Sequence, residues 1–322
     1  MYRKKIWFFN HYATNGFFNK VGRHYMFAKN LMEYGYKTIV FCANTRHNSQ
    51  DIIDIQNSKF VEIITEDIPY IFIKTSTYKN NGYSRVKNMV DFYKNLFPVA
   101  KEIAKIYGKP DIILASSVHP LTLVAGIKIA RKYNIPCICE VRDLWPETLV
   151  AYGGLNKNNI IVKLLYSGEK WIYKNANMLI CTMGGGKQYI IDKGWDKENG
   201  GPIDISKVYH INNGVDLELF DYNKKHYTVD DDDLNNGNCF KVVYTGSIRK
   251  ANNLEIVINA AKYIKAVSKK DIKFLIYGDG NEREYLQKKC LIENIDNVVF
   301  KGKVNKKYIP YIVSKSDLNI LN

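Results

Sequence analysis

The sequence predicts an α/β protein made of two doubly wound domains, each with a parallel sheet covered by helices on both faces. The chain has 322 residues, which is more than one ordinary domain holds. Its composition, 46% hydrophobic and 25% charged, is that of a globular protein. Short runs of β-branched and aromatic residues alternate with longer stretches of helical period, and this alternation is typical of βαβ units.

Strands in the first half are predicted at short apolar runs, such as KIWFF at 5–9 and DIILA at 111–115. The longer stretches between these runs repeat their apolar residues with the period of a helix. In chain order, we predict strands at 5–9, 37–43, 60–65, 68–74, 111–115, 136–141 and 178–182, and helices at 23–34, 84–107, 121–133 and 159–175.

The second half repeats the alternation, beginning with the run FKVVYT. We predict strands at 240–245, 272–277 and 297–301, helices at 253–268, 281–290 and 305–315, and the start of a further strand at 317–322. Between the halves, residues 205–239 hold a turn at 212–216 and an acidic run at 230–233, which we interpret as solvated. We therefore predict domains at 1–207 and 208–322, the second with too few strands for a complete doubly wound sheet.

The chain is strongly basic. Lys and Arg number 47 against 32 for Asp and Glu, so the formal net charge is +15, and only eight of the cations are arginines. Nucleic-acid-binding proteins favour Arg because its guanidinium contacts bases in a bidentate way, so we expect no nucleic-acid partner. Two interpretations stay open: a compositional bias towards Lys, Asn, Ile and Tyr, or a surface that contacts anionic lipid or phosphate.

The sequence gives no sign of a membrane span, because no segment has roughly 18 consecutive apolar residues. The apolar run after Lys5 stops at Asn10 and is too short for a signal peptide. We therefore expect a cytoplasmic protein, at most in peripheral contact with the inner membrane. The six cysteines are scattered through apolar segments, and we expect them to be reduced thiols.

Several common catalytic motifs are absent. The loop at 10–16, after the first predicted strand, is not G-x-G-x-x-G, and the sequence contains no P-loop motif, no G-x-S-x-G and no H-E-x-x-H. These absences argue against ordinary dehydrogenases, P-loop enzymes and the common hydrolases.

Polar residues cluster where predicted strands end. The clusters are Arg23-His24 after a glycine loop, Ser116–Pro120, Glu140–Glu147, Thr245–Lys250 and Gly278–Gly280. Ligands of doubly wound sheets bind beyond the carboxyl ends of the strands, so these clusters predict a site in a cleft between the two domains. Each cluster taken alone is also compatible with an ordinary turn.

Several of these segments resemble family 4 glycosyltransferases. They are 140–147 (EVRDLWPE), 212–216 (NNGVD), 244–255 (YTGSIRKANNLE), 278–283 (GDGNER) and 297–302 (NVVFKG). The resemblance extends in this order along the chain and implies the GT-B fold, in which two Rossmann-like domains face each other across a cleft. It also implies a retaining transfer from a nucleotide sugar. The openings NHYA and GRHY resemble the bacterial branch that builds O-antigen and capsule sugars, often amino sugars.

The resemblance implies a donor-binding loop at 246–252. Family members grip the donor diphosphate there with an Arg and a Lys, but this sequence has Ser247 and Asn252 at those positions. Arg249 and Lys250 lie inside the same loop, and we expect them to stabilise the leaving diphosphate. The alternative is that both are ordinary solvated loop residues.

Glycines are expected to contribute to the same donor site. Gly246 begins the donor loop, while Gly278 and Gly280 are expected to let the backbone approach the nucleotide. In the first domain, Gly16 and Arg23 match the family's glycine loop near the donor phosphates and the acceptor.

The resemblance also implies the residues beside the reacting sugar. His119 matches a histidine that the family places there, with a core histidine as the alternative. We expect His119 and Asp143 to be catalytic, and Arg142 and Glu140 to lie on the acceptor side. Asp143 either holds a sugar hydroxyl or orients the acceptor, unless it only caps the following turn.

The implied mechanism is a same-face substitution in which the leaving phosphate helps to deprotonate the acceptor. We therefore assign no protein nucleophile and no paired carboxylates. We expect no cofactor and no metal, because the donor, a UDP-linked sugar, is a substrate. The expected acceptor is a lipid-linked saccharide. Docking on an anionic membrane would then use the basic and aromatic residues of 78–97, unless those aromatic rings face the core.

The end of the sequence raises an alternative function. In this family a Glu-x7-Glu region, which supplies carboxylates at the sugar and at the ribose, follows shortly after the part that matches 317–321. The sequence ends at Asn322, so we expect either a fragment of a longer protein or a chain that does not catalyse alone. The alternative is a non-catalytic GT-B-like subunit that binds a partner protein or glycan. A sugar-nucleotide epimerase is disfavoured by the RDLWPE motif.

Overall fold

The computed structural model describes residues 4–46, 51–78, 82–151 and 156–321. The chain divides into two compact α/β units, Met1–Gly214 and Val215–Asn322. The division falls slightly after the predicted boundary between 207 and 208, because Val208–His210 is a strand that pairs within the sheet of the first unit.

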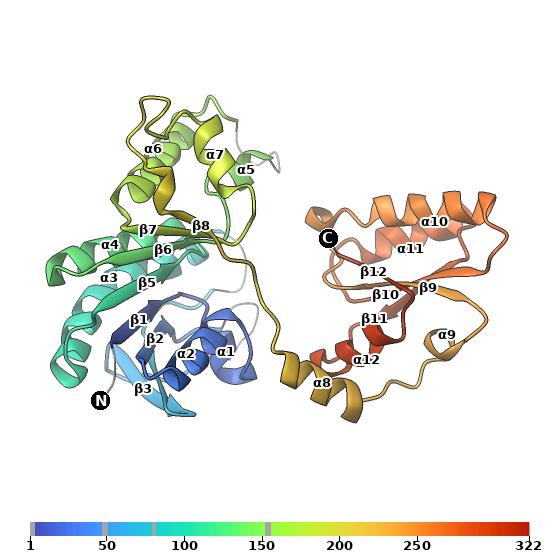
Figure 1. The fold of residues 1–322 in the computed structure, drawn as a ribbon, viewed down its shortest axis with the longest axis horizontal. Coiled ribbons are helices and arrows are strands. Elements are labelled where there is room, and N and C mark those ends of the chain that lie inside the picture. Colours follow the sequence, from blue (N-terminus) through green and yellow to red (C-terminus); the bar gives the residue numbers. More distant parts are fainter. Residues whose placement is uncertain (1–3, 47–50, 79–81, 152–155, 322) are drawn as a thin grey trace. The chain divides into compact units, whose positions relative to one another are not determined.

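The first unit is an α/β domain around one large sheet (Figure 1). Its strands are β1 (Lys5–Phe9), β2 (Lys37–Ala43), β3 (Phe60–Thr65), β4 (Ile68–Ile73), β5 (Ile112–Ser116), β6 (Cys137–Val141), β7 (Met178–Cys181) and β8 (Val208–His210). Its helices are α1 (Thr14–Asn19), α2 (Arg23–Glu33), α3 (Tyr83–Tyr107), α4 (Pro120–Tyr133), α5 (Glu147–Ala151), α6 (Ile160–Asn175), α7 (Gly186–Asp192) and the 3-10 helix η1 (Ile205–Lys207). Within the described residues, the strand order is β3-β4-β2-β1-β5-β6-β7-β8. All neighbouring strands are parallel except β3 and β4.

Alternate residues of the central strands enter separate hydrophobic cores on the two faces of this sheet. On β1, Trp7 belongs to the core that includes Phe92 of α3, whereas Phe8 belongs to the core that includes Tyr25 of α2. A strand whose successive side chains are all buried must lie between two layers of helices. Figure 1 shows α3 and α4 on one face of the sheet and α1 and α2 on the other. The predicted doubly wound arrangement is therefore present in this unit.

The strands and helices predicted for the first half are all present, with ends that differ by one residue at most. The short elements α1, α5, α7 and β8 were not predicted. They contain between three and seven residues, too few for a helical or strand period to stand out in the sequence. β8 is recognisable only through its pairing with β7.

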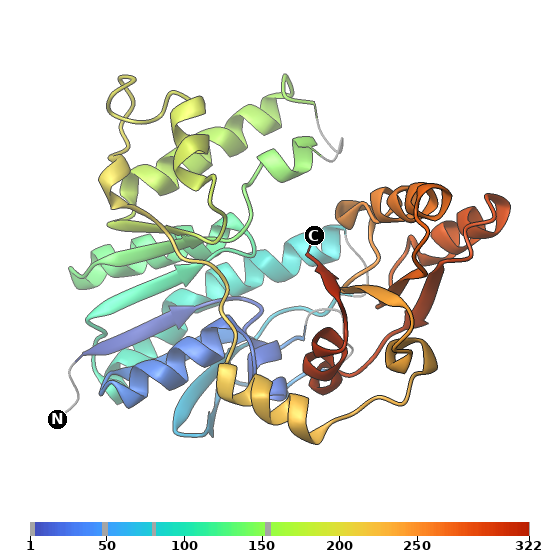
Figure 2. The same ribbon diagram turned by 45° about the vertical axis from the view of Figure 1, so that its right-hand side comes forward.

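The second unit is a smaller α/β domain, shown in a turned view in Figure 2. Its strands are β9 (Phe240–Thr245), β10 (Ile272–Tyr277), β11 (Val298–Gly302) and β12 (Leu318–Ile320). Its helices are α8 (Leu217–His226), α9 (Asp232–Asn235), α10 (Glu255–Val267), α11 (Arg283–Ile292), α12 (Ile309–Ser314) and the 3-10 helices η2 (Lys250–Asn252) and η3 (Lys306–Tyr308). The described strands form a parallel sheet in the order β11-β10-β9-β12. The strand predicted to begin at 317 is present as β12, paired with β9.

The acidic run at 230–233 corrects the prediction of a solvated segment. Asp231 and Asp233 both form ion pairs with Lys301 of β11, at 2.6 and 2.7 Å. Asp233 also pairs with Lys273 of β10 at 2.7 Å. Asp231 in addition accepts hydrogen bonds from the backbone at the start of α9. Two of the four carboxylates therefore tie the run to the sheet of the second unit, while Asp230 and Asp232 are exposed as expected.

The six cysteines are all buried free thiols, as expected. The Sγ atoms of Cys137 and Cys139 lie 3.9 Å apart, because residues two apart in a strand point to the same face. Among the described residues, no helix is both long enough and apolar enough to span a bilayer.

Candidate functional site

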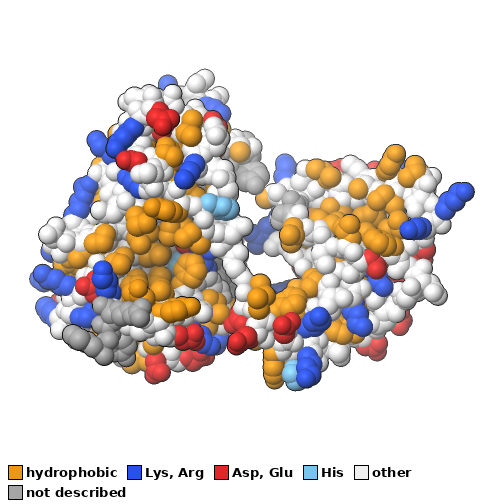
Figure 3. Space-filling model, in the orientation of Figure 1, with side chains coloured by type: hydrophobic (Ala, Val, Ile, Leu, Met, Phe, Trp, Pro, Cys, Tyr) orange, Lys and Arg blue, Asp and Glu red, His pale blue; other side chains and the backbone are white. Residues whose placement is uncertain are grey.

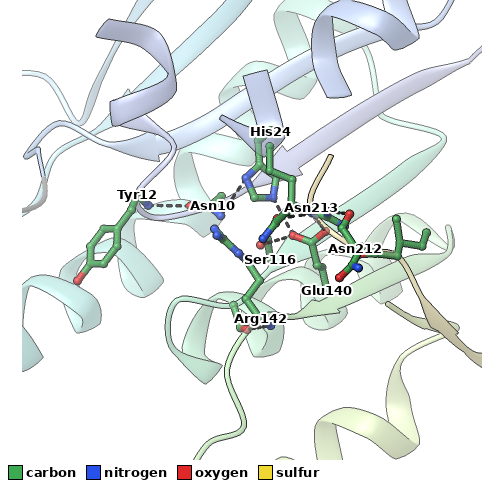
Figure 4. A network of polar contacts seen from close by, with 11 residues as sticks. Asn10, Tyr12, His24, Ser116, Glu140, Arg142, Asn212 and Asn213 are labelled. Carbon is green, nitrogen blue, oxygen red and sulfur yellow. Dashed lines mark hydrogen bonds and ion pairs between the residues drawn. The ribbon is translucent and has the colours of Figure 1, made fainter. Parts of the chain in front are cut away.

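The carboxylate of Glu140 is the centre of a buried polar network in the first unit (Figure 4). Its Oε1 accepts a hydrogen bond from Arg23 Nε at 2.7 Å. Its Oε2 accepts from His24 Nε2 at 2.9 Å and from Ser116 Oγ at 2.7 Å. The network joins the carboxyl ends of β5 and β6 to the first turn of α2. These are the strand ends at which the sequence places polar clusters.

Glu140 is an anion at neutral pH despite complete burial. Burial alone raises the pKa of a carboxyl group, but here the hydrogen bonds from His24, Ser116 and Arg23 outweigh it and lower the pKa of Glu140 to about 2. The charge of Arg23 supplies the balancing cation, since a guanidinium stays protonated in proteins.

The hydrogen-bond pattern also assigns the tautomer of His24. Asn10 Oδ1 accepts from the backbone N–H of Tyr12 at 2.8 Å, which orients the amide nitrogen of Asn10 towards His24 Nδ1, 3.2 Å away. His24 therefore accepts at Nδ1 and donates from Nε2 to Glu140. Figure 4 shows these residues in a row from Tyr12 to Glu140.

Arg23 serves a different purpose from the one predicted. Besides Glu140, its guanidinium donates to the carbonyl oxygens of Asn212 at 2.6 Å and Ile211 at 3.0 Å. Its side chain is only 5% exposed. These hydrogen bonds hold the chain at 211–213 against the sheet. Because the guanidinium of Arg23 already has partners inside the protein, it is not presented to a ligand. We had expected Arg23 at the donor phosphates. Gly16 is likewise a packing residue: an added Cβ would lie 3.2 Å from Tyr25 Cβ.

His119 is buried at the amino end of α4, 1% exposed. Its Nε2 lies 2.7 Å from Nδ1 of His11, so one proton is shared between the two rings. His11 in turn stacks on Phe92, with ring centroids 4.5 Å apart. Burial and the positive charge of Arg85 lower the pKa of His119 to about 3. The ring is therefore neutral, and among the described residues its Nδ1 has no hydrogen-bond partner.

Arg142 and Asp143 follow directly after β6. The backbone N–H of Arg142 donates to Ser117 Oγ at 2.9 Å, which fixes the start of this loop. The side chain of Asp143 is exposed and forms no hydrogen bond or ion pair with a described residue. The alternative of a capping role for Asp143 thus has no contact to support it in the described structure.

Glu147, the last residue of the RDLWPE motif, has a structural partner that sequence reasoning missed. Its carboxylate contacts Lys193 Nζ at 2.7 Å and accepts from Tyr166 OH at 2.6 Å. These contacts join α5 to α6 and to the end of α7. Hydrogen bonds from Lys193 and Tyr166 lower the pKa of Glu147.

In the second unit, Gly278 and Gly280 join two loops at the carboxyl ends of β9 and β10. A Cβ on Gly278 would lie 1.8 Å from the carbonyl oxygen of Gly246, and one on Gly280 would lie 2.1 Å from that of Ile248. Gly278 also has a positive φ of 154°. Ile248 N–H donates to Asp279 O at 3.0 Å. We expected these glycines to make room for a nucleotide, but the Cβ positions are filled by the neighbouring loop.

The contact between the two loops fixes the position of the loop after β9, which carries the predicted cations Arg249 and Lys250. Ser247, Arg249 and Lys250 are exposed. The side chains of Arg249 and Lys250 form no hydrogen bond or ion pair with a described residue. A third cation, Arg283, begins α11 directly after the glycine loop, and its Nη1 lies 3.7 Å from Asp279 Oδ1. An anion approaching this edge of the sheet would meet Arg249 and Lys250 without having to displace any described side chain.

The network around Glu140 includes partners that sequence reasoning did not nominate, namely Asn10 and the backbone carbonyls of Ile211 and Asn212, whereas His24 and Ser116 lie in the polar clusters that it did nominate. Asn10 and His24 lie in motifs that carried the family resemblance. Their partners could not be read from spacing, since Arg23 and Glu140 are 117 positions apart in the chain.

Two family models match the chain in adjoining parts. Residues 23–219, more than half of the chain, match the model described as Glycosyltransferase Family 4. The chain belongs to glycosyltransferase family 4. Residues 229–322 of this glycosyltransferase match a second model, described as Glycosyl transferases group 1. No curated protein matches the chain.

Solved structures resemble this glycosyltransferase over nearly its whole length. The structure named "Trehalose-6-phosphate from E. coli bound with UDP-2-fluoro glucose" is 8% identical, and the match covers 99% of this chain and 78% of the other with a TM-score of 0.65. A glycosyltransferase from Rickettsia africae is 16% identical, with coverages of 99% and 73% and a TM-score of 0.58. The lipopolysaccharide outer core galactosyltransferase WaaB is 14% identical, with coverages of 97% and 71% and a TM-score of 0.50. At these identities the likeness shows the fold alone, and it confirms the predicted pair of Rossmann-like domains of the GT-B type.

Proposed function

We propose that this glycosyltransferase moves an N-acetylated amino sugar from a UDP-linked donor to a lipid-linked saccharide, with retention at the anomeric carbon. The product would enter a bacterial surface polysaccharide such as O-antigen or capsule. The observation that carries the proposal is the pair of exposed cations, Arg249 and Lys250, on a loop held in place by Gly278 and Gly280. Family membership supplies the reaction class, and the NHYA, GRHY and RDLWPE segments support the pathway.

The donor would bind to the second unit. A nucleoside diphosphate leaves with its negative charge concentrated on two phosphates, so catalysis needs fixed positive charge at the point where that charge develops. Arg249 and Lys250 can supply it without reorganisation, because their loop is already hydrogen-bonded to the loop after β10. The relative bound with UDP-2-fluoro glucose supports a uridine nucleotide as donor.

The acceptor would bind to the first unit. Asp143 is the exposed carboxylate after β6, and we assign it to a hydroxyl group of the acceptor, with Arg142 beside it. Glu140 is too deeply buried to touch a sugar and acts as a positioning residue for the β6 end. His119 is neutral, and its Nδ1 has no hydrogen-bond partner among the described residues, so we assign it one hydrogen bond to a sugar hydroxyl.

Retention needs no nucleophile from the protein in this proposal. The departing phosphate takes the proton of the acceptor hydroxyl on the same face of the sugar, so the bond to phosphate breaks as the bond to the acceptor forms. We propose no cofactor and no metal. Within the described residues, no group of three His, Cys, Asp or Glu side chains is placed to hold an ion.

The proposal is tested on UDP binding and on turnover. Replacing Arg249→Gln together with Lys250→Gln removes both charges, which have no partner among the described residues. We expect the affinity for UDP to fall about 30-fold or more, since each charged contact contributes about 1–2 kcal/mol. The matched control is Lys269→Gln with Lys270→Gln. These exposed lysines precede β10, at the opposite edge of the same sheet, and their replacement should change the affinity less than twofold.

Calorimetric titration with UDP gives the affinities, and release of UDP from UDP-N-acetylglucosamine in the presence of a lipid-linked saccharide gives the turnover. Equal affinity losses in the two double variants would overturn the assignment of the donor loop. UDP binding without any acceptor-dependent release would overturn the transferase proposal.

A second candidate, a non-catalytic GT-B-like subunit that binds a partner protein or glycan, rests on one specific observation. Ser247 and Asn252 stand where family members carry the Arg and Lys that grip the diphosphate. This candidate predicts that the unchanged protein binds no UDP at all. Substitutions Ser247→Arg and Asn252→Lys would then create nucleotide affinity that the native chain lacks.

A further inference from the structure

Helix α6 carries an exposed apolar stripe that no described part of the first unit covers. Ile160, Ile161 and Leu164 are 74%, 57% and 66% exposed. Trp171 extends the same stripe two turns further along, 36% exposed. With 3.6 residues per turn, these positions fall on one side of the helix. On the opposite side, Val162 and Tyr173 are buried. Ile172, eleven positions after Ile161 and therefore close to the stripe, is buried as well.

A row of lysines runs beside the stripe. Lys163 and Lys174 are exposed, and Lys170 lies between them, half-buried. Arg131 of α4 adds a further cation, with its guanidinium 5.6 Å from the ring of Trp171. The one acidic residue of α6, Glu169, is buried, where it accepts from Tyr173 and Tyr189. The surface of α6 therefore combines apolar and positive side chains with no negative charge. In the part of the first unit where Figure 1 places α6 and α7, Figure 3 shows hydrophobic side chains and Lys and Arg side chains, with Asp and Glu side chains nearby.

The stripe begins at the same edge of the sheet as the proposed acceptor residues. α6 connects β6 to the parallel strand β7, so it runs back against the strand direction. Its first turn, with Ile160 and Ile161, therefore lies at the carboxyl edge, where Arg142 and Asp143 follow β6. A surface touching this turn would lie next to the site to which an acceptor would be delivered.

We propose that this face of α6 docks on an anionic lipid bilayer and sets the first unit against the membrane from which a lipid-linked acceptor is drawn. The inference deepens the proposed function and rests on its lipid-linked acceptor. Apolar side chains beside a lysine row are the pattern of a helix that lies in the interface of a charged membrane. A second copy of the chain fits less well, because each copy carries a formal charge of +15 and the lysine rows would repel.

The docking segment expected from the sequence, 78–97, is only partly exposed. On α3, Phe92 and Leu96 are buried, and Tyr93 and Phe97 pack against the core. Three aromatic residues of 78–97, namely Phe92, Tyr93 and Phe97, thus serve the core, whereas Tyr83 at the start of α3 is 84% exposed. Residues 79–81 of that segment lie outside the described residues.

The experiment measures binding of the full chain to vesicles of phosphatidylcholine alone and of phosphatidylcholine mixed with phosphatidylglycerol. The first variant, Ile161→Gln with Leu164→Gln, should weaken binding to the anionic vesicles about tenfold or more. The second, Lys163→Gln with Lys174→Gln, should weaken it about fivefold per lysine and reduce its salt dependence. Circular dichroism and thermal unfolding confirm that each variant is folded.

The chain offers a matched control on the second unit. Ile256 and Val267 of α10 are 63% and 61% exposed, close to the values for Ile161 and Leu164. Replacing both with Gln should leave vesicle binding unchanged. Equal losses from the α6 and α10 pairs would overturn the proposal, as would equal binding to neutral and anionic vesicles. So would a sedimentation experiment in which the α6 pair turns a dimer of the native chain into a monomer.

Two outcomes separate this inference from the proposed function. Transfer to a water-soluble acceptor analogue without any vesicle binding by the native chain would overturn the docking surface and leave the transferase intact. Vesicle binding that depends on α6, in a chain that neither binds UDP nor transfers sugar, would support the docking surface and overturn the transferase.

Discussion

The carboxylate of Glu140 receives three hydrogen bonds from two separate segments, the start of α2 and the end of β5, and one of these donors is a permanent cation. A buried charge is tolerated only when it is neutralised and fully hydrogen-bonded, so each partner depends on the others. Arg23 is the cation of this pair, and its guanidinium also donates hydrogen bonds to the carbonyl oxygens of Ile211 and Asn212. The pair thereby joins β6, α2 and the end of the first unit.

Glu140→Gln should destabilise the first unit by about 3 kcal/mol, because it leaves the charge of Arg23 buried without a counter-ion. Chemical unfolding at pH 7 measures the loss. The matched control is Glu147→Gln, which breaks a partly exposed pair with Lys193 and should cost about 1 kcal/mol or less. Equal losses of unfolding free energy in the two variants would mean that the buried Glu140 network stabilises the first unit no more than a partly exposed ion pair does.

The same substitution should change the acid side of the stability profile. The pKa of Glu140 is lowered from its ordinary value of 4.5 to about 2, so its contribution is complete above pH 4.5 and is lost as the pH falls towards 2. The shift corresponds to about 3 kcal/mol. Unfolding free energies measured from pH 6 to pH 3 should therefore fall more steeply for the native chain than for Glu140→Gln.

His119 should act on the stability profile at higher pH. Its pKa is lowered from 6.5 to about 3, so below pH 6.5 the unfolded chain binds a proton that the folded chain excludes. Stability is then lost as the pH falls, by up to about 1.4 kcal/mol per pH unit between these two values. His119→Gln should remove this slope between pH 6 and pH 5, where Glu140 is still ionised in both states. A slope unchanged by the substitution would show that the ring is not held neutral.

The sequence nominated several of the residues that meet at this site but not their contacts. Arg23 and Glu140 were both candidates, for phosphate and acceptor, yet the structure pairs them with each other. Their pairing depends on strand order, which places β1, β5 and β6 side by side. The polar residues at each strand end identify candidates for the site. The spacing of these residues along the chain does not show which of them are in contact.

At the scale of elements, the loops after β9 and β10 behave as one unit because glycine allows backbone to lie on backbone. The Cβ positions of Gly278 and Gly280 are occupied by the carbonyl oxygens of Gly246 and Ile248. Hydrogen bonds between the same loops connect Ile248 to Asp279 and to Glu282. The position of Arg249 and Lys250 is therefore set partly by the neighbouring loop.

Gly280→Ala should separate the two loops, because the new methyl group would lie 2.1 Å from the carbonyl oxygen of Ile248. We expect a loss of about 1–3 kcal/mol in the stability of the second unit and a UDP affinity lowered about tenfold or more. Gly237→Ala is the control, since no atom lies within 4 Å of the Cβ position there. Thermal unfolding and calorimetric titration measure both effects. An unchanged UDP affinity in Gly280→Ala would show that loop position does not matter for the donor.

Helices and strands could be predicted from the sequence where they are long enough for the pattern of apolar residues to repeat. Apolar runs predict the strands β1, β2 and β9, and the helical period of apolar residues predicts α3 and α10. β8 and α9 are short and polar at several positions, and they form because of long-range contacts. α9 follows Asp231, whose carboxylate is held by Lys301 from β11. From the sequence alone, a run of four Asp residues predicts a segment exposed to solvent.

At the scale of the whole molecule, the two units have separate hydrophobic cores. The core residues of the first unit all precede Gly214, and those of the second all follow Val215. The doubly wound pattern of each unit was predictable from the alternation of strands and helices. The exact division was not, since residues 208–210 join the first sheet only through pairing with β7.

Ile312→Ala should therefore weaken only the second unit. Ile312 is completely buried, and its truncation should cost about 2–4 kcal/mol. Hydrogen exchange should quicken in β9 and β10 and stay unchanged in β1 and β2. Leu96→Ala, at an equally buried position of the first unit, should give the opposite pattern. Quickened exchange in both units after either substitution would mean that the two cores do not unfold separately.

The contact between the two glycine loops limits how this enzyme can be re-engineered. A graft that brings only the 246–252 loop from another transferase would introduce a backbone path that the native 278–282 loop does not fit. Chimeras intended to change donor preference should therefore exchange the two loops together, as a single cassette.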